Sequence, residues 1–313
     1  MRSDPKAVII TVNFRQDQCT LEFLKSASKL AEFDSCHFLI VDNNSDDGSV
    51  NSIRRASLKF SNVTLLSSPQ NGGYFGAANW ALQRYLVNHD CPDWVIVCNN
   101  DIVFGDRRFL LRLVETNPTN AVIAPCIISG LTRCDANPSI RHRPSRFRMW
   151  RYRFWLSNFY LAWFKQALSP YVRRSRMRNN SGSDTEPFRR RPIYAPYGAL
   201  VIFSRSFFDA GGFIDGGSFL YAEELRIAEM CRRLRLPIMH DPELRVWHKE
   251  SQSTGRFLTR AVYQHQKNGF EYALSRYKNP YPELVPPSLP LAAPAPDPML
   301  DSITVPIPGE RAS

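Results

Sequence analysis

Residues 94–101, with the sequence WVIVCNND, constrain the fold more than any other stretch of the chain. Residues 94–98 are apolar and rich in β-branched side chains, and such a short run suits a strand buried on both faces. The run ends at three small polar residues, Asn99, Asn100 and Asp101. Polar residues of this kind form ordinary turns, but they also bind ligands at the carboxyl ends of strands in open α/β sheets. This stretch alone leaves both interpretations open.

Three earlier segments repeat the pattern of a buried strand followed by a polar loop. Helical spacing predicts a helix over 19–33, a second over about 49–60, and a third that follows Asn79 and ends near Asn88. Strands alternating with helices, without hairpin signals, predict a parallel sheet covered on both faces. The predicted strands of this half are 6–13, 37–41, 63–66 and 94–98.

Polar residues follow all four predicted strands. Because the carboxyl ends of parallel strands meet at one edge of a sheet, we expect these loops to lie together and to form a nucleotide-binding cleft. The loops are Thr11-Val12-Asn13, Asp42-Asn43, Asn71-Gly72-Gly73 and Asn99-Asn100-Asp101.

The glycine pattern excludes two common nucleotide-binding classes. No GxGxxG motif follows the first strand and no P-loop is present, which disfavours a dinucleotide oxidoreductase and a P-loop enzyme. Glycines at 72, 73 and 76 follow the third strand instead. They would let the backbone approach a ligand closely or form a tight strand-to-helix turn, and the two roles are compatible.

A helix over 108–115 and a strand over 121–128 precede a change in composition. In residues 141–178 arginines alternate with aromatic side chains. Such a stretch can lie on an anionic membrane surface, pack its rings on the core, or bind single-stranded nucleic acid. We favour these three in that order, and expect no nucleic-acid partner.

The overall charge also points to an anionic partner, because the net charge is +11. No run of about 18 apolar residues and no signal-peptide layout is present, which predicts a cytoplasmic protein. The basic aromatic stretch at 141–178 predicts that it is peripheral on the cytoplasmic face of the inner membrane. The seven cysteines are scattered without a CxxC pair, so neither a disulfide framework nor a zinc site is expected.

The second half of the chain brings two adjacent carboxylates, Glu223 and Glu224, to the start of a helix predicted over 224–234. Glutamates in a first turn stabilise the helix dipole, and a glutamate above a cleft can also act as a general base. A strand over 192–205, a short helix over 207–212 and a strand over 237–247 complete the pattern. Residues 279–313 are Pro-rich and are predicted to be a disordered tail.

Together these segments resemble a family 2 glycosyltransferase of the GT-A fold, and most closely its rhamnosyltransferase-like branch. The resemblance runs from Val8 to Asn268 and is interrupted by the arginine-aromatic insertion. Each motif is weak alone, but their order and spacing are specific. The motifs are TVN at 11–13, VDNNSDDGS at 41–49, NGGYFGAAN at 71–79, CNND at 98–101, YGAL at 197–200, FLYAEE at 219–224, His248, SQSTG at 251–255 and Lys267-Asn268.

The resemblance implies an α/β architecture with a Rossmann-like, mostly parallel central sheet and helices on both faces. The glycosyltransferase domain would span 1–278. Within it we expect a nucleotide-binding half at about 1–128, the basic aromatic insertion at about 141–191, and an acceptor half at about 192–278.

The resemblance also implies roles for individual residues. Asp42 would accept a hydrogen bond from the imide N–H of uracil or thymine. Asp101 would bind Mg²⁺ or Mn²⁺, and His248 would contact the metal or the diphosphate. Glu224 would be the general base, with Glu223 as the alternative. The other residues expected to contact the nucleotide-sugar are Thr11, Asn13, Asn71, Gly73, Asn99 and Asn100.

The implied reaction is an inverting transfer of a sugar, with rhamnose as a candidate, from a UDP- or dTDP-sugar. The acceptor would be a hydroxyl of a growing, lipid-linked bacterial surface polysaccharide. A sugar nucleotidyltransferase remains an alternative, although the expected Gly-rich loop after the first strand is missing. A degenerate membrane scaffold is another, but the presence of Asp42, Asp101 and His248 together argues against it.

Two positions depart from the family pattern. Glu224 stands where the family has Asp, and Arg226 stands where the branch often has an acidic residue. We expect Arg226 either to pair with Glu224 and lower its pKa or to bind an anionic acceptor or donor phosphate.

Overall fold

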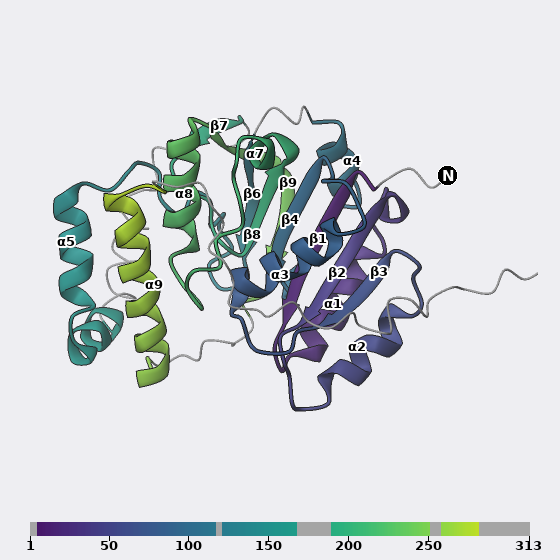
Figure 1. The fold of residues 1–313 in the computed structure, drawn as a ribbon, viewed down its shortest axis with the longest axis horizontal. Helices are drawn as coiled ribbons and strands as arrows, with labels where there is room; N and C mark the ends of the chain where they lie inside the picture. The colour runs from purple at the N-terminus through teal and green to yellow at the C-terminus, as the bar shows by residue number, and fades with distance from the viewer. Residues whose placement is uncertain (1–4, 117–120, 168–188, 251–257, 282–313) are drawn as a thin grey trace, which may run out of the picture.

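The computed structural model describes residues 5–116, 121–167, 189–250 and 258–281. Its centre is a mixed sheet in which the order β3-β2-β1-β4-β8-β6-β9-β5 runs across the molecule and β7 pairs with β9 (Figure 1). The predicted α/β class is therefore confirmed, and the first four strands are parallel as expected. The motif SQSTG at 251–255 lies outside the described residues.

The first four strands are mutually parallel, so their carboxyl ends share one edge. At that edge Asn13 lies opposite Asp42, and Val12 lies opposite Asn99. Helix α3 begins at Tyr74, earlier than expected, so the NGGYFGAAN motif supplies its first turns. The elements are β1 (Ala7–Asn13), α1 (Asp17–Ala27), η1 (Phe33–Ser35), β2 (Cys36–Asp42), α2 (Ser49–Ser57), β3 (Val63–Ser67), α3 (Tyr74–Leu86) and β4 (Trp94–Asn99).

The second half adds strands of both directions. β8 lies antiparallel between β4 and β6, whereas β6 and β9 are parallel. This makes the sheet mixed and brings the start of β8 to the edge where β4 ends. The elements are β5 (Ile102–Val103), α4 (Phe109–Val114), β6 (Val122–Ser129), α5 (Arg146–Trp155), β7 (Arg191–Ile193), β8 (Leu200–Ser204), α7 (Arg205–Asp209), α8 (Glu223–Leu234), β9 (Ile238–His248) and α9 (Arg260–Lys278).

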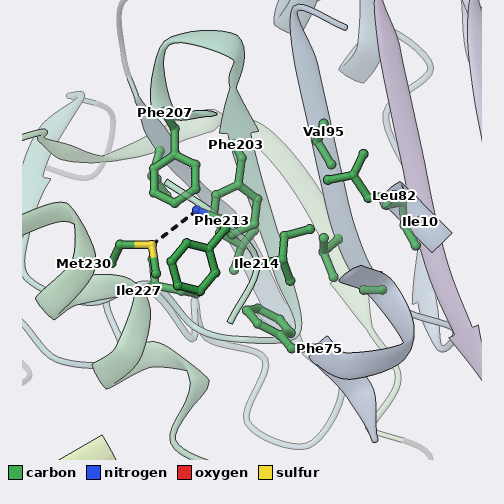
Figure 2. Close-up of a cluster of buried hydrophobic side chains, with 14 of the residues drawn as sticks. Ile10, Phe75, Leu82, Val95, Phe203, Phe207, Phe213, Ile214, Ile227 and Met230 are labelled. Carbon is green, nitrogen blue, oxygen red and sulfur yellow. Dashed lines mark hydrogen bonds between the residues drawn. The ribbon is translucent and has the colours of Figure 1, made fainter. Parts of the chain in front are cut away.

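Alternate residues of the central strands feed two apolar layers, one on each face of the sheet. In β1, Val8 and Ile10 join the cluster that contains α3 and α8, while Ala7 and Ile9 join the one that contains α1 and α4. All four side chains are buried, which explains why this strand is apolar throughout rather than alternating. In the first layer the backbone N–H of Phe213 donates to Met230 Sδ at 3.4 Å (Figure 2).

The insertion forms helix α5, which packs on α9, and α9 packs on α8 (Figure 1). Met149 is the residue of α5 that is buried in this cluster, together with Leu225 of α8 and Phe270 of α9. Core packing therefore accounts for one face of α5 but not for its outer face. Residues 168–188, which include most of the polar loop predicted at 179–191, lie outside the described residues.

The first three residues of the tail predicted at 279–313 belong to the described part of the fold. Residues 279–281 are described, and Tyr281 is only 1% exposed because its ring packs in the first apolar layer. The rest of the predicted tail, 282–313, lies outside the described residues. Across the described ranges, no helix is both long enough and apolar enough to span a bilayer.

Candidate active site

Asp42 and Asn13 form a buried pair at the ends of β2 and β1. Asn13 Nδ2 donates to Asp42 Oδ1 at 3.0 Å, and Thr20 Oγ1 donates to Asn13 Oδ1 at 2.9 Å. The backbone N–H of Ser45 donates to Asp42 Oδ2 at 3.0 Å. A carboxylate has about four acceptor sites, so Asp42 is held in place and retains capacity for one more donor. Thr20 and Ser45 are partners that the sequence patterns did not indicate.

Two predicted nucleotide contacts lie deeper than expected. Thr11 is 1% exposed and faces Cys98 across the β1–β4 ladder, one pair inside the edge. Asn100 donates to Thr20 Oγ1 at 3.0 Å and to the carbonyl of Gln16 at 3.3 Å. These contacts join the end of β4 to the start of α1, so in this structure both residues support the edge from within.

Asn43 fastens the glycine loop to the end of β2. Its Nδ2 donates to Asn71 Oδ1 at 2.7 Å and to the carbonyl of Gly73 at 3.2 Å. Its Oδ1 accepts the backbone N–H of Gly72 at 2.9 Å. Asn43 is 3% exposed, and its side-chain amide gives this loop the hydrogen bonds that the backbone of a neighbouring strand would otherwise supply. The sequence pattern placed it in the polar loop but gave it no role.

Gly73 is required by its surroundings. Its φ is +74°, and a Cβ there would lie 2.0 Å from the carbonyl oxygen of Phe219. The next residue, Tyr74, donates its backbone N–H to the same oxygen at 3.1 Å. The glycine loop after β3 therefore lies directly against the FLYAEE segment at 219–224.

Asp101 and His248 are adjacent although they are far apart in the sequence. His248 Nε2 lies 3.1 Å from Asp101 Oδ1 and 3.3 Å from Asn99 Nδ2. Pairing of β5 with β9, which sets Ile102 opposite His248, produces this arrangement. Both Asp101 and His248 are largely buried, at 6% exposure each.

The spacing of Asp101 and His248 fits a shared divalent cation. Two neighbouring ligand atoms of an octahedral ion, each at about 2.1 Å, are separated by about 3 Å. Nowhere in the described ranges do three or more His, Cys, Asp or Glu residues gather closely enough to hold a metal alone. A cation at Asp101 and His248 would need oxygens of a substrate and water to complete its shell, as Mg²⁺ and Mn²⁺ sites for phosphates do.

The two glutamates stand at the start of α8 in different environments. Glu224 Oε1 accepts the backbone N–H of Gly198 at 3.4 Å, whereas Glu223 Oε1 lies 3.5 Å from Arg226 Nη2. Burial raises the pKa of Glu223 to about 7, despite the opposing effect of Arg226. Burial also raises the pKa of Glu224 above its usual range. Both carboxyls are thereby shifted toward the range useful for proton transfer near neutral pH.

The backbone immediately before these glutamates is strained. Tyr221 and Ala222 have φ values of +72° and +61°, a left-handed conformation that side chains with a Cβ disfavour. Strain of this kind costs on the order of 1–3 kcal/mol per residue and is typical of functional sites.

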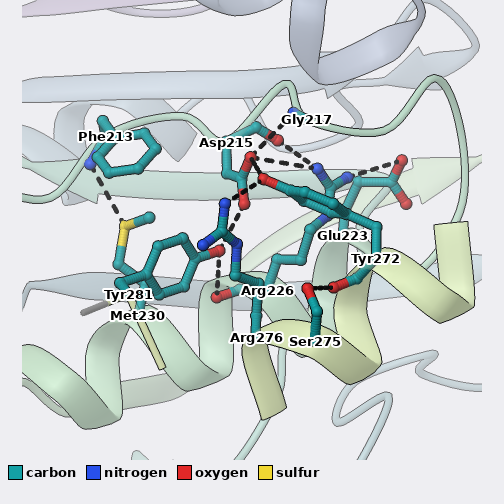
Figure 3. Close-up of polar contacts among 10 residues, drawn as sticks. All are labelled: Phe213, Asp215, Gly217, Glu223, Arg226, Met230, Tyr272, Ser275, Arg276 and Tyr281. Atoms are coloured by element: carbon teal, nitrogen blue, oxygen red, sulfur yellow. Dashed lines mark hydrogen bonds and ion pairs between the residues drawn. The ribbon is translucent and has the colours of Figure 1, made fainter. Parts of the chain in front are cut away.

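Arg226 does not have the environment expected for it. Its side chain is 1% exposed, Nη1 donates to the carbonyl of Asp215, and its ion pairs are with Asp215 and Glu223 (Figure 3). The predicted ion pair with Glu224 is not formed, although the charge of Arg226 lowers the pKa of that carboxyl against the larger, opposite effect of burial. The Asp215 carboxylate also accepts Tyr272 Oη at 3.0 Å and Tyr281 Oη at 2.5 Å. Asp215 was missed because a single Asp in an irregular segment carries no sequence signal.

Tyr74 is another residue of the site that the sequence patterns did not indicate. Its hydroxyl is buried and has no hydrogen-bond partner among the described residues. Burial raises the pKa of Tyr74, and the neighbouring acidic groups, which include Glu223, Asp101 and Glu224, raise it further. The hydroxyl therefore lies among the acidic groups of the site.

Tyr197 and Gly198, just before β8, connect the Asp101–His248 pair to Glu224. The rings of Tyr197 and His248 are 5.9 Å apart between centroids, and Gly198 donates to Glu224. With the Gly73–Phe219 contact, this link brings the predicted nucleotide, metal and base residues around one edge of the sheet. Such an edge can hold a nucleoside diphosphate beside a carboxylate base.

Comparison with known proteins defines the class. The model of the family "Glycosyl transferase family 2" matches residues 7–181, so the chain belongs to that family and is a glycosyltransferase. Its curated relatives include the N-acetylglucosaminyl-diphospho-decaprenol L-rhamnosyltransferases of two Mycobacterium tuberculosis strains. Each is 26% identical over 277 residues, with 86% of this chain and 84% of the relative covered.

Solved structures with low sequence identity share the GT-A-like fold. One is the mannosyltransferase PcManGT from Pyrobaculum calidifontis in complex with GDP-Man and Mn²⁺, with a TM-score of 0.50, 13% identity, and coverage of 87% of this chain and 73% of that one. Another is GalNAc-T7 with UDP, GalNAc and Mn²⁺, with a TM-score of 0.57 and 12% identity. That alignment covers 87% of this chain and 48% of GalNAc-T7.

Proposed function

We propose that this glycosyltransferase moves a sugar, with inversion, from a UDP- or dTDP-sugar to a hydroxyl of a lipid-linked glycan that grows into a bacterial surface polysaccharide. The name of the mycobacterial relatives supports rhamnose as the sugar and a polyprenyl-diphosphate-linked acceptor. The observation that carries the proposal is the single edge at which Asp42, the Asp101–His248 pair and Glu224 meet.

In the nucleotide-binding half, about 1–128, Asp42 would accept the imide N–H of uracil or thymine. Its orientation is fixed by Asn13 and Ser45, which supports selection of a base rather than a general role as an acid. A guanine or adenine base does not present the same N–H at that position. Asn71 and Gly73 would border the sugar and phosphates, held there by Asn43.

Asp101 and His248 would hold Mg²⁺ or Mn²⁺, with Asn99 beside them. Both solved structures of similar fold contain Mn²⁺. The bound cation would stabilise the negative charge that develops on the leaving diphosphate. Because Asp101 and His248 are the two such ligands that the described residues bring together, the cation would bind tightly only together with the donor.

In the acceptor half, about 192–278, Glu224 would take the proton of the attacking hydroxyl. Gly198 holds one of its oxygens, and the side chain is more accessible than that of Glu223. Glu223 faces Arg226 and the interior, so we assign it the task of fixing the start of α8. Attack from the side opposite the diphosphate inverts the anomeric carbon.

The donor assignment is tested by thermal shift with UDP, dTDP and GDP, with and without Mn²⁺. Saturating ligand at about 100 times its dissociation constant adds about 2.7 kcal/mol, which raises the melting temperature by roughly 5–10 °C. We expect this shift with UDP or dTDP and Mn²⁺. An equal shift with GDP would contradict the role of Asp42. The acceptor is tested separately, by measuring sugar transfer to a soluble lipid-diphosphate sugar.

A further inference from the structure

Helix α5 carries a stripe of exposed aromatic rings on the face that points away from α9. Phe147, Trp150 and Phe154 are 68%, 60% and 47% exposed. Their rings stack in sequence, with centroids 5.8 Å and 6.0 Å apart. The opposite face of the helix is anchored by Met149, which is 2% exposed. Packing of the core therefore does not explain the three exposed rings.

The helical residues 159–167, which follow α5, carry three more exposed rings. Tyr160, Trp163 and Phe164 are 67%, 49% and 51% exposed. The turn between the two helices is held on α9, because Tyr263 Oη donates to the carbonyl of Leu156 at 3.0 Å. We call the six exposed rings the aromatic face: Phe147, Trp150, Phe154, Tyr160, Trp163 and Phe164.

The charge around the aromatic face has one sign. Residues 141–167 contain six arginines and one lysine but no aspartate or glutamate. Arg143 and Arg153 pair with acidic residues of α8 and α9. Within the described ranges, no ion pair involves Arg146, Arg148 or Arg151, and all three are exposed.

We propose that the aromatic face docks on the surface of an anionic lipid bilayer. Aromatic rings partition to the headgroup level of a membrane, and arginines beside them bind lipid phosphates. A protein partner would need an acidic rim to match this charge, and a second copy of this face would repel it. The choice of a bilayer rests on the lipid-linked acceptor proposed above.

The position of the aromatic face relative to the site supports this occupant. The inner side of α5 shares an apolar cluster with Leu225, the residue after Glu224. A bilayer bound on the outer side would therefore lie on the acceptor half of the protein. A polyprenyl chain could remain in the membrane while its sugar head reaches the glutamates.

The test is co-sedimentation of the full chain with phosphatidylcholine vesicles, with and without phosphatidylglycerol, in the absence of donor and acceptor. We expect binding to the anionic vesicles that weakens with salt. Each arginine near a charged bilayer contributes about fivefold to affinity, so changing Arg146, Arg148 and Arg151 to Gln should weaken binding about 100-fold. The matched control changes Arg54 and Arg55 of α2 and Lys59, two residues after this helix, to Gln and should stay within about threefold of the parent.

The aromatic contribution is tested with Ser at Phe147, Trp150 and Phe154, which should weaken binding at least about 10-fold without lowering the melting temperature. Its control combines Leu58→Ser, Val87→Ser and Leu131→Ser, which change apolar side chains that are more exposed than the three rings but lie elsewhere. Equal losses in both control and test variants would overturn the proposal, as would equal binding to neutral vesicles. Binding to single-stranded RNA that depends on the same rings, without vesicle binding, would also overturn it. Because no transfer is measured, failure here leaves the proposed reaction testable on its own.

Discussion

Arg226 Nη2 lies 3.5 Å from Glu223 Oε1, one turn along α8, and the guanidinium is 1% exposed. The same group is bonded to Asp215, which also accepts the hydroxyls of Tyr272 and Tyr281. Arg226 stands where the resembling family branch often has an acidic residue. Here it is a buried counterion for Asp215 and Glu223. Through Asp215, Tyr272 and Tyr281 it links α8 to α9 and to the residues after α9 (Figure 3).

Arg226→Met should destabilise the fold strongly. The change leaves Asp215 and Glu223 buried without their cation, and breaking a buried pair in this way typically costs about 3–5 kcal/mol. Urea denaturation followed by circular dichroism gives the free energy of unfolding. Arg233→Met, an exposed arginine on the same helix, is the control and should change it by less than about 0.5 kcal/mol. A loss below about 1 kcal/mol for Arg226→Met would show that the network is not a stabilising unit.

The pKa of Glu223 predicts how the stability depends on pH. Burial raises this pKa from 4.5 to about 7, so between these values the folded state keeps a proton that the unfolded chain has released. Stability from this group is therefore present below pH 4.5 and is lost as pH rises to about 7. Relative to Glu223→Gln, the wild type should lose up to about 3 kcal/mol over this interval. A difference that is flat with pH would mean that Glu223 is ionised throughout.

Glu224→Gln tests the base. The change keeps the shape but removes the basic oxygen, so turnover at saturating donor should fall about 10²- to 10⁴-fold with donor affinity unchanged. Because burial raises the pKa of Glu224, the wild-type rate should rise with pH through a midpoint above 4.5, and the variant should lose that rise. Glu224→Asp should keep measurable activity. Loss in Glu223→Gln with normal rates in Glu224→Gln would move the role to Glu223.

Asp101→Ala should abolish the effect of Mn²⁺ on donor binding. Wild-type protein is expected to bind UDP or dTDP more tightly with Mn²⁺, because Asp101 and His248 together suit one cation. Isothermal titration of the nucleotide with and without Mn²⁺ measures this difference. Asp93→Ala, at the other end of β4 and 55% exposed in its side chain, is the control. If Mn²⁺ strengthens binding to Asp101→Ala as it does to wild type, the ligand lies elsewhere.

The sheet edge could be predicted because it depends on local patterns. A short apolar run ending in polar residues specifies a buried strand and its loop, and parallel order then places Asn13, Asp42 and Asp101 at one edge. Helix boundaries were less predictable, since α3 begins at Tyr74 to satisfy the Phe219 carbonyl, a contact that no local pattern encodes. The antiparallel position of β8 between β4 and β6 was also not predictable, because it depends on pairing between strands that are far apart in the sequence.

The partners of buried polar side chains were less predictable. Arg226 pairs with Asp215 and Glu223 and not with Glu224, because its side chain is buried on the side of α8 where those two carboxylates lie. Asn43 could have been suspected, since it follows Asp42 in a polar loop. Its role depends on the distance to Gly72 and Gly73, which only the folded chain defines.

Tyr74→Phe tests whether the buried hydroxyl at the start of α3 contacts the substrate. Its oxygen has no hydrogen-bond partner in the described part of the chain, and the contact between Gly73 and Phe219 holds this residue against the acceptor half. An unsatisfied buried hydroxyl costs free energy, so its removal should leave the melting temperature unchanged or slightly higher. If the hydroxyl bonds a sugar or phosphate oxygen, turnover or donor affinity should fall about 10-fold, the equivalent of one hydrogen bond. Tyr85→Phe, another buried tyrosine of the same helix, should leave the transfer rate unchanged. Wild-type kinetics in Tyr74→Phe would show that the hydroxyl makes no contact with substrate, and a lower melting temperature would show that it has a partner in the folded protein.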